Sequence, residues 1–393
     1  MAKNLYVLAE MFYPVSTGLE INMLNTYKHM SFRGWNIEVH TTKVNDVNRD
    51  ASTGHSEIFG LKIFRHNFYG FSFIPFFIRP PFMKSGTIVF HDFIILPHIF
   101  LYSYALILKL LGLKRCRLIF SSHGLFNYNS SIYPGLRMKI RKLIDRSIGV
   151  FLINRTVDAI RAVSEVEARG LIAQGIRADL ITEIKNGIEE FAFDDIDTKV
   201  DSDFKEKIKK LDDYIIQVAR IDRVKNQVSA IVALACAKNK KTKLIFLGPV
   251  NSVRYKTELD RLISNLSLKD RVIFWGTEVG YQKYYLVKNA KMLVHMAYAE
   301  GFCNAVHEAM SQGVVCIVAK GSAQEKLIKN GVNGFSEEAD DYEKIAHRID
   351  WAMDSSNEEE LELMRKNNIN FAAGHTWESV SFKVEKLYSN PDY

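Results

Sequence analysis

Short apolar runs alternate with helix-forming segments along most of this 393-residue chain. Several runs end in glycine or a polar residue, and the segments between them have the apolar spacing of amphipathic helices. This alternation is typical of βα units, whose parallel strands form a sheet covered by helices. The sequence therefore predicts the α/β class. The strands expected in the second half are 214–220, 243–248, 271–276, 291–296 and 314–319.

The first half shows the same pattern. The elements expected there are strands at 5–10, 35–42, 87–92 and 116–124, with a helix over 19–32. In doubly wound sheets, ligands bind beyond the carboxyl ends of the strands. Gly18, Asp92 and His123 fall at such ends and are therefore candidate ligand-facing residues.

The length of the chain favours two domains, because single cores rarely grow to this size. Residues 191–212 are poor in apolar side chains and rich in charge, which is typical of a linker. Two Rossmann-like halves of similar size would then flank this segment. A cleft between two such domains is a common place for a ligand.

Composition indicates a globular protein, with 47% hydrophobic and 25% charged residues. The four cysteines are scattered without metal-ligand spacing, as expected of reduced thiols in the cytoplasm. The N-terminal residues lack the apolar region of a signal peptide. The most apolar stretch, 99–113, is shorter than a membrane span and contains Lys109. We therefore predict a cytoplasmic protein.

The positive charge is concentrated in the first half. Residues 1–190 contain 23 Lys and Arg against 15 Asp and Glu, whereas the remainder contains 29 against 30. Much of the excess lies in 113–117 and 135–155, and an aromatic stretch occupies 68–82. Two interpretations remain: a solvated amphipathic helix, or a face that contacts anionic lipid or an anionic acceptor. No recognition motif supports nucleic-acid binding.

Two cations follow the first strand of the second half. Arg220 offers a fork of donors and Lys225 a compact charge, a combination that suits a diphosphate. The alternative is that both are solvated loop residues.

Two carboxylates, Glu300 and Glu308, flank the expected start of a helix. The first backbone N–H groups of a helix are unsatisfied and form an anion site, which the helix dipole favours. Carboxylates also accept hydrogen bonds from vicinal hydroxyls, such as those of a ribose or a hexose. The alternative is a helix whose acidic residues only favour its N-terminus.

The order and spacing of these features resemble the retaining glycosyltransferases of family 4. The similarity covers nearly the whole chain, and the Glu300-x7-Glu308 spacing is its most specific element. The segments that carry it include 13–20, 121–124, 186–191, 219–226 and 300–319. The resemblance implies a GT-B fold, in which two Rossmann-like doubly wound domains face each other across a cleft. It also implies an N-terminal domain over 1–190, joined by a closing helix in 376–393, and a C-terminal domain over 191–375.

The resemblance further implies roles for individual residues. Arg220 and Lys225 would hold the diphosphate of the donor, Glu300 the sugar hydroxyls and Glu308 the ribose. His123 would lie near the anomeric carbon, and Gly18 would let the backbone approach the phosphates. The backbone amides close to the donor would be those of Phe302, Cys303, Asn304 and Ala305. The family needs no metal, and the sequence offers no convincing metal motif.

The chain departs from the family pattern at three places. Thr17 stands where the first loop usually has a glycine, and Lys185 where a proline often precedes Asn-Gly. Cys303-Asn304-Ala305 replaces a segment in which glycine and proline are common. These differences bear on positioning and donor choice more than on the class of reaction.

The sequence thus predicts a retaining glycosyltransferase that uses a UDP- or GDP-linked sugar and requires no other cofactor. Its acceptor would be a saccharide or lipid-linked saccharide in cell-envelope polysaccharide synthesis. A peripheral position at the inner face of the membrane is a further hypothesis. The alternatives are a nucleotide-sugar epimerase of the same fold and a non-catalytic nucleotide-sugar-binding subunit.

Overall fold

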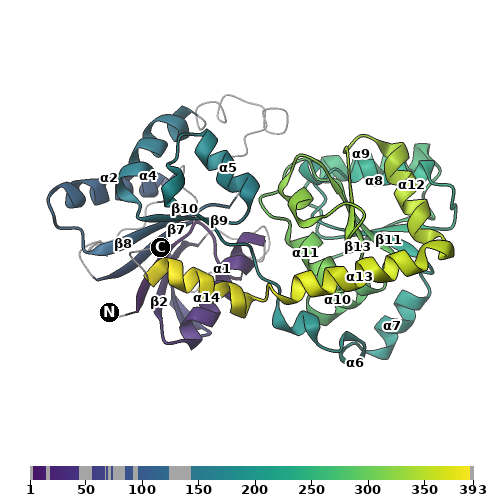
Figure 1. Ribbon diagram of the computed structural model, residues 1–393, viewed down its shortest axis with the longest axis horizontal. Helices are drawn as coiled ribbons and strands as arrows, with labels where there is room; N and C mark the ends of the chain where they lie inside the picture. Colours follow the sequence, from purple (N-terminus) through teal and green to yellow (C-terminus); the bar gives the residue numbers. More distant parts are fainter. Residues whose placement is uncertain are drawn as a thin grey trace. The chain divides into compact units, whose positions relative to one another are not determined.

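The computed structural model divides the chain into two compact α/β units (Figure 1). The N-terminal unit contains Met1–Gly187 and Trp377–Tyr393, and the C-terminal unit contains Ile188–Thr376. The chain therefore passes between the units twice. The structure describes residues 3–14, 18–43, 55–66, 68–69, 72–73, 85–91, 96–123 and 143–389. The predicted residue Asp92, the segment 15–17 and most of the aromatic stretch 68–82 lie outside these ranges.

The sheet of the N-terminal unit has the strand order β10-β9-β8-β7-β1-β2-β4-β3. All neighbouring strands are parallel except β3 and β4. The chain extends the sheet from β1 in one direction and then from β7 in the other, so the topological switch point lies between these two strands. The strands are β1 (Asn4–Leu8), β2 (Asn36–Thr42), β3 (His55–Ile58), β4 (Leu61–His66), β7 (Gly86–His91), β8 (Cys116–Ser121), β9 (Ala159–Ala162) and β10 (Ile181–Glu183), and β5 (Phe68–Tyr69) and β6 (Ser72–Phe73) form a separate antiparallel pair.

Alternate side chains of β1 enter two different cores, as expected of a strand covered on both faces. Leu5 and Val7 pack with α1 and α14, whereas Tyr6 and Leu8 pack with α2 and α4. The helices are α1 (Gly18–Phe32), α2 (Leu96–Leu110), α4 (Val150–Thr156), α5 (Glu165–Ala173) and α14 (Trp377–Ser389), with a π-helical turn at Asp145–Gly149. The last helix of the chain thus completes the first unit by packing beside α1 (Figure 1).

The C-terminal unit has a fully parallel sheet with the order β13-β12-β11-β14-β15-β16. This is the doubly wound order in which a ligand crevice forms between the first and fourth strands. The strands are β11 (Tyr214–Val218), β12 (Lys243–Leu247), β13 (Val272–Gly276), β14 (Met292–His295), β15 (Cys316–Ala319) and β16 (Gly334–Glu337). The predicted strands of this half are therefore confirmed to within a few residues.

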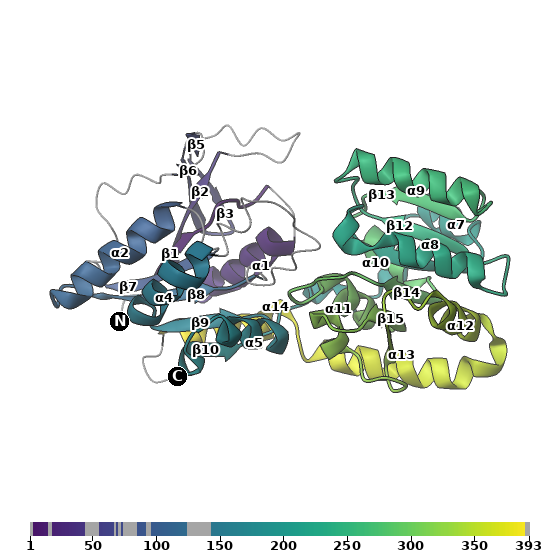
Figure 2. The ribbon, with the colours of Figure 1, turned by 90° about the horizontal axis from the view of Figure 1, so that it is seen from above.

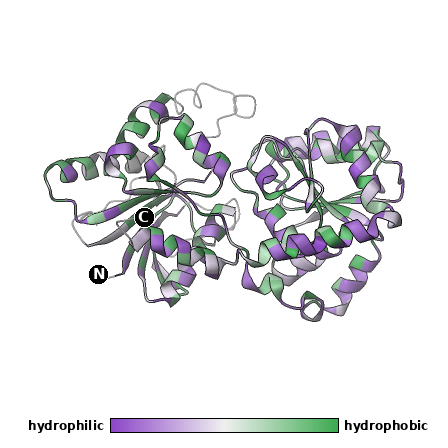
Figure 3. Cartoon of the chain, in the orientation of Figure 1, coloured by the Kyte–Doolittle hydropathy of each residue, from purple (hydrophilic) through white to green (hydrophobic). Residues whose placement is uncertain are grey.

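Helices flank this sheet, with α8 and α9 near β12 and β13 and with α11 and α12 near β14 and β15 (Figure 2). Figure 3 shows hydrophobic residues along the strands of this sheet, whereas hydrophobic and hydrophilic residues alternate along the helices. The helices are α6 (Ile196–Lys199), α7 (Ser202–Lys209), α8 (Gln227–Cys236), α9 (Val253–Asn265), α10 (Gly280–Lys288), α11 (Asn304–Ser311), α12 (Tyr342–Met353) and α13 (Glu358–Ala373).

The interpretation of residues 191–212 as a linker is wrong, because this segment folds into α6 and α7 of the C-terminal unit. The Asp201 carboxylate caps α7 by accepting a hydrogen bond from the backbone N–H of Phe204 at 2.8 Å. Phe204 and Ile208, one turn apart, are both buried, and the Phe204 ring packs edge-on against Trp275. Two apolar anchors are enough to dock a short helix whose other residues are polar or charged.

The Asn186-Gly187 turn contacts the first residue of α14. A Cβ atom added to Gly187 would lie 2.6 Å from Cδ2 and 2.7 Å from Cα of Trp377. Trp377 itself is buried in the core that contains α1. Glycine is therefore needed at position 187 for close packing, a requirement that a turn signal alone does not reveal.

Gly187→Ala should destabilise the N-terminal unit by about 1–3 kcal/mol, the usual cost of overpacking a rigid contact. Gly170→Ala is the matched control, because it makes the same change in α5, where no atom lies within 4 Å of the new methyl group. Helix propensity predicts that this control is neutral or stabilising by up to about 1 kcal/mol. Urea unfolding of both variants measures the difference, and equal stabilities would contradict the packing argument.

Candidate functional site

The loop after β11 holds Lys225 at the switch point of the C-terminal sheet. A 3-10 turn, Arg223–Lys225, is capped by the Asp222 carboxylate. The Gln217 side chain donates to the Lys225 carbonyl at 2.7 Å. Asn226 takes a left-handed conformation, and its side chain donates to the carbonyl of Met296 after β14, at 3.0 Å. These bonds fix the lysine backbone between the two strands that border the crevice.

Glu300 follows β14 and meets Lys225 there. Its Oε1 atom lies 2.6 Å from Lys225 Nζ and 2.8 Å from His295 Nε2. Its backbone N–H donates to the Ser322 hydroxyl at 2.8 Å. Burial opposes ionisation, but Lys225 and the His295 hydrogen bond together lower the pKa of Glu300 to about 2. The carboxylate is therefore ionised at neutral pH, and both of its side-chain hydrogen bonds use Oε1.

Helix α11 begins directly after this carboxylate. Cys303, the residue before the helix, has a left-handed backbone with φ +76°. Phe302 and Cys303 are buried, whereas Asn304 and Ala305 are partly exposed, so a ligand can reach the first turn. Burial, with the nearby Glu300 charge, raises the pKa of the Cys303 thiol well above its usual range. The thiol stays protonated and is not a nucleophile.

Glu308 lies in the second turn of α11, where Lys283 of α10 approaches its Oε1 atom at 3.0 Å. Burial and the neighbouring Glu189 raise the pKa of Glu308, although Lys283 opposes the shift. Tyr284 donates its hydroxyl to Glu189 at 2.7 Å. Glu300 and Glu308 thus each have their own lysine, which supports two separate binding functions.

Arg220 lies two residues beyond β11 and is exposed. Its backbone carbonyl accepts a hydrogen bond from Gln227 at 3.0 Å. The structure does not bring its guanidinium into an ion pair with any described carboxylate, so the side chain is available to an anion from solution.

In the N-terminal unit, His123 follows β8 and contacts His91, the last residue of β7. His91 Nδ1 lies 2.8 Å from His123 Nε2, and the Ser121 hydroxyl lies 3.2 Å from the same nitrogen. Burial and the charge of Arg161 lower the pKa of His123 to about 3, so the ring is neutral at physiological pH. Gly18 is the first residue of α1, and Gly124 lies outside the described residues.

Arg161, on β9, is fully buried in a polar cluster close enough to His123 to affect its pKa. It donates to the Asn22 side chain at 3.2 Å and to the Ile184 carbonyl at 3.3 Å. Asn22 also hydrogen-bonds to Asn186, the residue before Gly187. The Asn-Gly motif is therefore part of this buried cluster as well as a turn.

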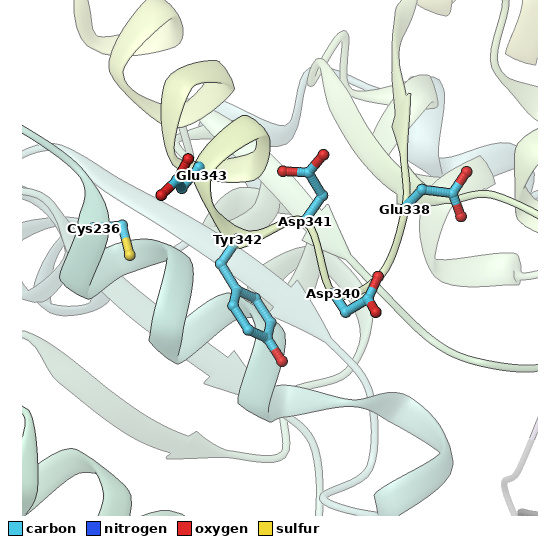
Figure 4. A pocket seen from close by; sticks show the side chains of 6 residues that line it. All are labelled: Cys236, Glu338, Asp340, Asp341, Tyr342 and Glu343. Atoms are coloured by element: carbon cyan, nitrogen blue, oxygen red, sulfur yellow. The ribbon is translucent and has the colours of Figure 1, made fainter.

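A hollow of about 540 Å³ lies at the start of α12 (Figure 4). It is lined by Cys236, Tyr342 and four carboxylates, those of Glu338, Asp340, Asp341 and Glu343. This acidic lining would repel a diphosphate, so the hollow does not suit the ligand that the Lys225–Glu300 site favours.

His295, Glu300 and Cys303 present ligand-type atoms within 4.8 Å of one another. The Lys225 ammonium group already contacts the same Glu300 carboxylate. A cation next to this carboxylate would meet that positive charge and a protonated thiol, so the arrangement does not suit a metal ion.

A lysine and a carboxylate at the switch point of a doubly wound sheet, with a second carboxylate one turn inside the adjoining helix, define a class of protein. They are typical of two-domain GT-B transferases that take a sugar from a nucleotide-sugar donor. The chain belongs to glycosyltransferase family 4: the model "Glycosyltransferase Family 4" matches residues 16–190 and "Glycosyl transferases group 1" matches 199–371. It is accordingly a retaining glycosyltransferase of the hexosyl-transferring type, and the resemblance found in the sequence is confirmed.

Solved structures share the fold along almost the whole chain. HepE of Anabaena, in complex with UDP and glucose, is 17% identical over 98% of both chains, with a TM-score of 0.74. Sucrose-phosphate synthase from Thermosynechococcus elongatus is 16% identical over 98% of both chains, with a TM-score of 0.76. WaaG, a glycosyltransferase involved in lipopolysaccharide biosynthesis, is 13% identical over 98% of this chain and 100% of its own, with a TM-score of 0.67. No curated protein sequence matches the chain.

Three site residues were not predicted from the sequence. His295 lies within the apolar run 291–296, and Lys283 has the appearance of a surface cation on a helix. His91 directly precedes Asp92, and Asp92 was the residue predicted to face a ligand. The only signal was a polar residue at or near the end of an apolar strand, which would have identified His91 and His295.

The low pKa of Glu300 predicts how its contribution to stability depends on pH. Such a carboxylate stabilises the fold fully above its unfolded pKa of about 4.3, and this contribution is lost as the pH falls toward about 2. The difference in unfolding free energy between the wild type and Glu300→Gln should therefore be about 1–2 kcal/mol smaller at pH 3 than at pH 7.

Urea unfolding at both pH values provides the measurement. Glu360→Gln, at an exposed position on α13, is the control, and its difference from the wild type should stay near zero at both pH values. If the difference in unfolding free energy between the wild type and Glu300→Gln stays constant or grows as the pH falls, Lys225 and His295 do not hold an ionised carboxylate.

Proposed function

We propose that this glycosyltransferase moves a hexose from a UDP- or GDP-linked donor onto a saccharide or lipid-linked saccharide acceptor in cell-envelope polysaccharide synthesis. The observation that carries the proposal is the Lys225–Glu300 contact at the switch point, followed by Glu308 in the adjoining helix. Cations and backbone N–H groups of the protein would neutralise the diphosphate, a task that other enzymes give to a metal.

The donor would lie with its diphosphate over the start of α11. Lys225 has three N–H donors and uses one for Glu300, so others can reach a phosphate oxygen. Arg220 is exposed beside the same strand and can add a fork of donors. As the bond to the sugar breaks, negative charge grows on the departing diphosphate. Fixed cations and the N-terminus of α11 stabilise that charge.

The two carboxylates would hold opposite ends of the donor. Both hydrogen bonds of the Glu300 side chain use Oε1, which favours Oε2 as the acceptor for sugar hydroxyls. Lys283 likewise orients Oε1 of Glu308, so its other oxygen can accept the ribose hydroxyls. His123, neutral at physiological pH, would hydrogen-bond near the anomeric carbon. In a retaining reaction on one face of the sugar, the departing phosphate oxygen takes the proton of the acceptor hydroxyl.

UDP-glucose is the first donor to test, because HepE has been solved in complex with it. The same assay separates the two alternatives. An epimerase would change the donor without an acceptor, and a non-catalytic subunit would bind the donor without releasing UDP.

Glu300→Ala should lower the turnover number by about 10²-fold, because the sugar loses its fixed orientation. Its affinity for free UDP should change little, since Glu308 and Lys283 remain. Glu308→Gln should instead weaken the binding of UDP and of UDP-sugar together. Steady-state kinetics and calorimetric titration with UDP measure both effects. Unchanged transfer by Glu300→Ala, or an effect on free UDP that equals that of Glu308→Gln, would contradict these roles.

An exposed apolar surface on the N-terminal unit supports a lipid-linked acceptor at a membrane. Ile107, Leu110 and Leu111, near the end of α2, are 53%, 78% and 64% exposed, respectively. Lys109 donates to the carbonyl of Arg155 at the end of α4, which brings basic side chains beside these apolar ones. Apolar residues with flanking cations are typical of proteins that lie on anionic lipid. Among the described residues, no helix is long and apolar enough to cross a membrane.

The double variant Leu110→Glu/Leu111→Glu should bind anionic vesicles at least ~10-fold more weakly than the wild type, because apolar burial is lost and charges repel. Leu363→Glu, at a 62% exposed position on α13, is the matched control and should bind like the wild type. Sedimentation with phosphatidylserine-containing and neutral vesicles measures the binding. Equal wild-type binding to both kinds of vesicle, or none to either, would contradict the hypothesis of a membrane surface at an anionic inner face.

A further inference from the structure

His91 is a buried histidine to which the proposed reaction assigns no role. Its ring bridges two other residues of the N-terminal unit. Nδ1 lies 2.8 Å from His123 Nε2, and Nε2 lies 2.5 Å from the Tyr27 hydroxyl on α1. The rings of His91 and His123 are nearly parallel, with centroids 5.0 Å apart and an interplanar angle of 19°. Because the two nitrogens are only 2.8 Å apart, the rings lie edge to edge, and the hydrogen bond holds His123 in place.

Chemistry gives this chain of hydrogen bonds a direction. A phenol is a stronger acid than a neutral imidazole N–H, and an imidazole nitrogen is a better acceptor than a phenol oxygen. The favoured bond is thus Tyr27 O–H to His91 Nε2. A neutral imidazole carries one proton, so that of His91 must lie on Nδ1, from which it is donated to His123 Nε2.

The same rule then fixes the proton of His123. Its Nε2 atom accepts from His91, so its own proton must lie on Nδ1. Burial, together with the neighbouring Tyr388, raises the pKa of Tyr27 well above its usual value, so the Tyr27 hydroxyl keeps the proton that it donates. His123 therefore presents an N–H group on the side of its ring away from His91.

We propose that His91 is a positioning residue that holds His123 in the Nδ1–H tautomer, so that His123 acts as a hydrogen-bond donor toward the sugar nucleotide and not as a general base. The part of this inference that concerns the sugar nucleotide rests on the proposed role of His123 in transfer. The part that concerns the tautomer rests on the geometry of the free protein alone.

Nuclear magnetic resonance of the ¹⁵N-histidine-labelled protein without ligand tests the tautomer. Two-bond correlation spectra distinguish the protonated from the unprotonated ring nitrogen, and the His123 signals are assigned by their loss in His123→Asn. We expect protonated Nδ1 in the wild type. A proton on Nε2 of His123 would overturn the proposal.

Three variants connect the tautomer to turnover. His91→Leu removes the donor and should lower the turnover number by about 10- to 10²-fold, with UDP affinity unchanged. His91→Asn can still donate from its amide at the position of Nδ1 and should recover most of the activity. Tyr27→Phe removes only the hydroxyl that sets the direction of the hydrogen bonds from Tyr27 through His91 to His123. It should give His123 a mixture of tautomers with a smaller loss of turnover.

Tyr102→Phe is the matched control for Tyr27→Phe, since it removes a buried hydroxyl from the other core of the same unit. It should leave the His123 tautomer and the turnover as in the wild type. Full activity and an unchanged tautomer in both His91→Leu and Tyr27→Phe would overturn the positioning role. An Nδ1–H tautomer in a chain that transfers no sugar would contradict the proposed function and still support the positioning of the ring.

Discussion

The contact between Lys225 and Glu300 organises the C-terminal unit around its ligand crevice. The two residues lie 75 positions apart in the sequence and follow β11 and β14, the strands that border the topological switch point. The pair can be partly buried because each charge has a partner and the carboxylate has a second donor in His295. The two charges are therefore held in a fixed orientation by the protein itself, as the proposed donor site requires.

At the corresponding strand ends, the N-terminal unit has hydrogen-bonded histidines in place of an ion pair. There the rings of His91 and His123 lie edge to edge at the ends of β7 and β8, joined by a hydrogen bond. Burial, together with the positive charge of Arg161, keeps the pKa of His123 low, so this ring is neutral. The two units thus differ in their chemistry, since one holds fixed charges at its strand ends and the other holds neutral hydrogen-bonding rings.

Much of the fold could be predicted from the sequence, because strands and helices have local apolar periods. The linker interpretation of 191–212 failed because α7 docks through only two apolar residues, Phe204 and Ile208, too few for a clear period. The predicted site residues Glu300 and Lys225 meet, but His295, a partner of Glu300, and Lys283, the partner of Glu308, were not predicted. Those contacts depend on which strand ends and helices become neighbours, and no local pattern encodes that information. The Asn186-Gly187 pair is typical of a turn, but only the structure reveals the close contact of Gly187 with Trp377.

A structure of the protein with a bound UDP-sugar tests the central claim most directly. We expect sugar hydroxyls within hydrogen-bonding distance of Glu300 Oε2, the diphosphate at Lys225 and the start of α11, and the ribose at Glu308. A donor bound in the reverse direction, with its ribose at Glu300, would contradict the account. So would a diphosphate that lies away from Lys225.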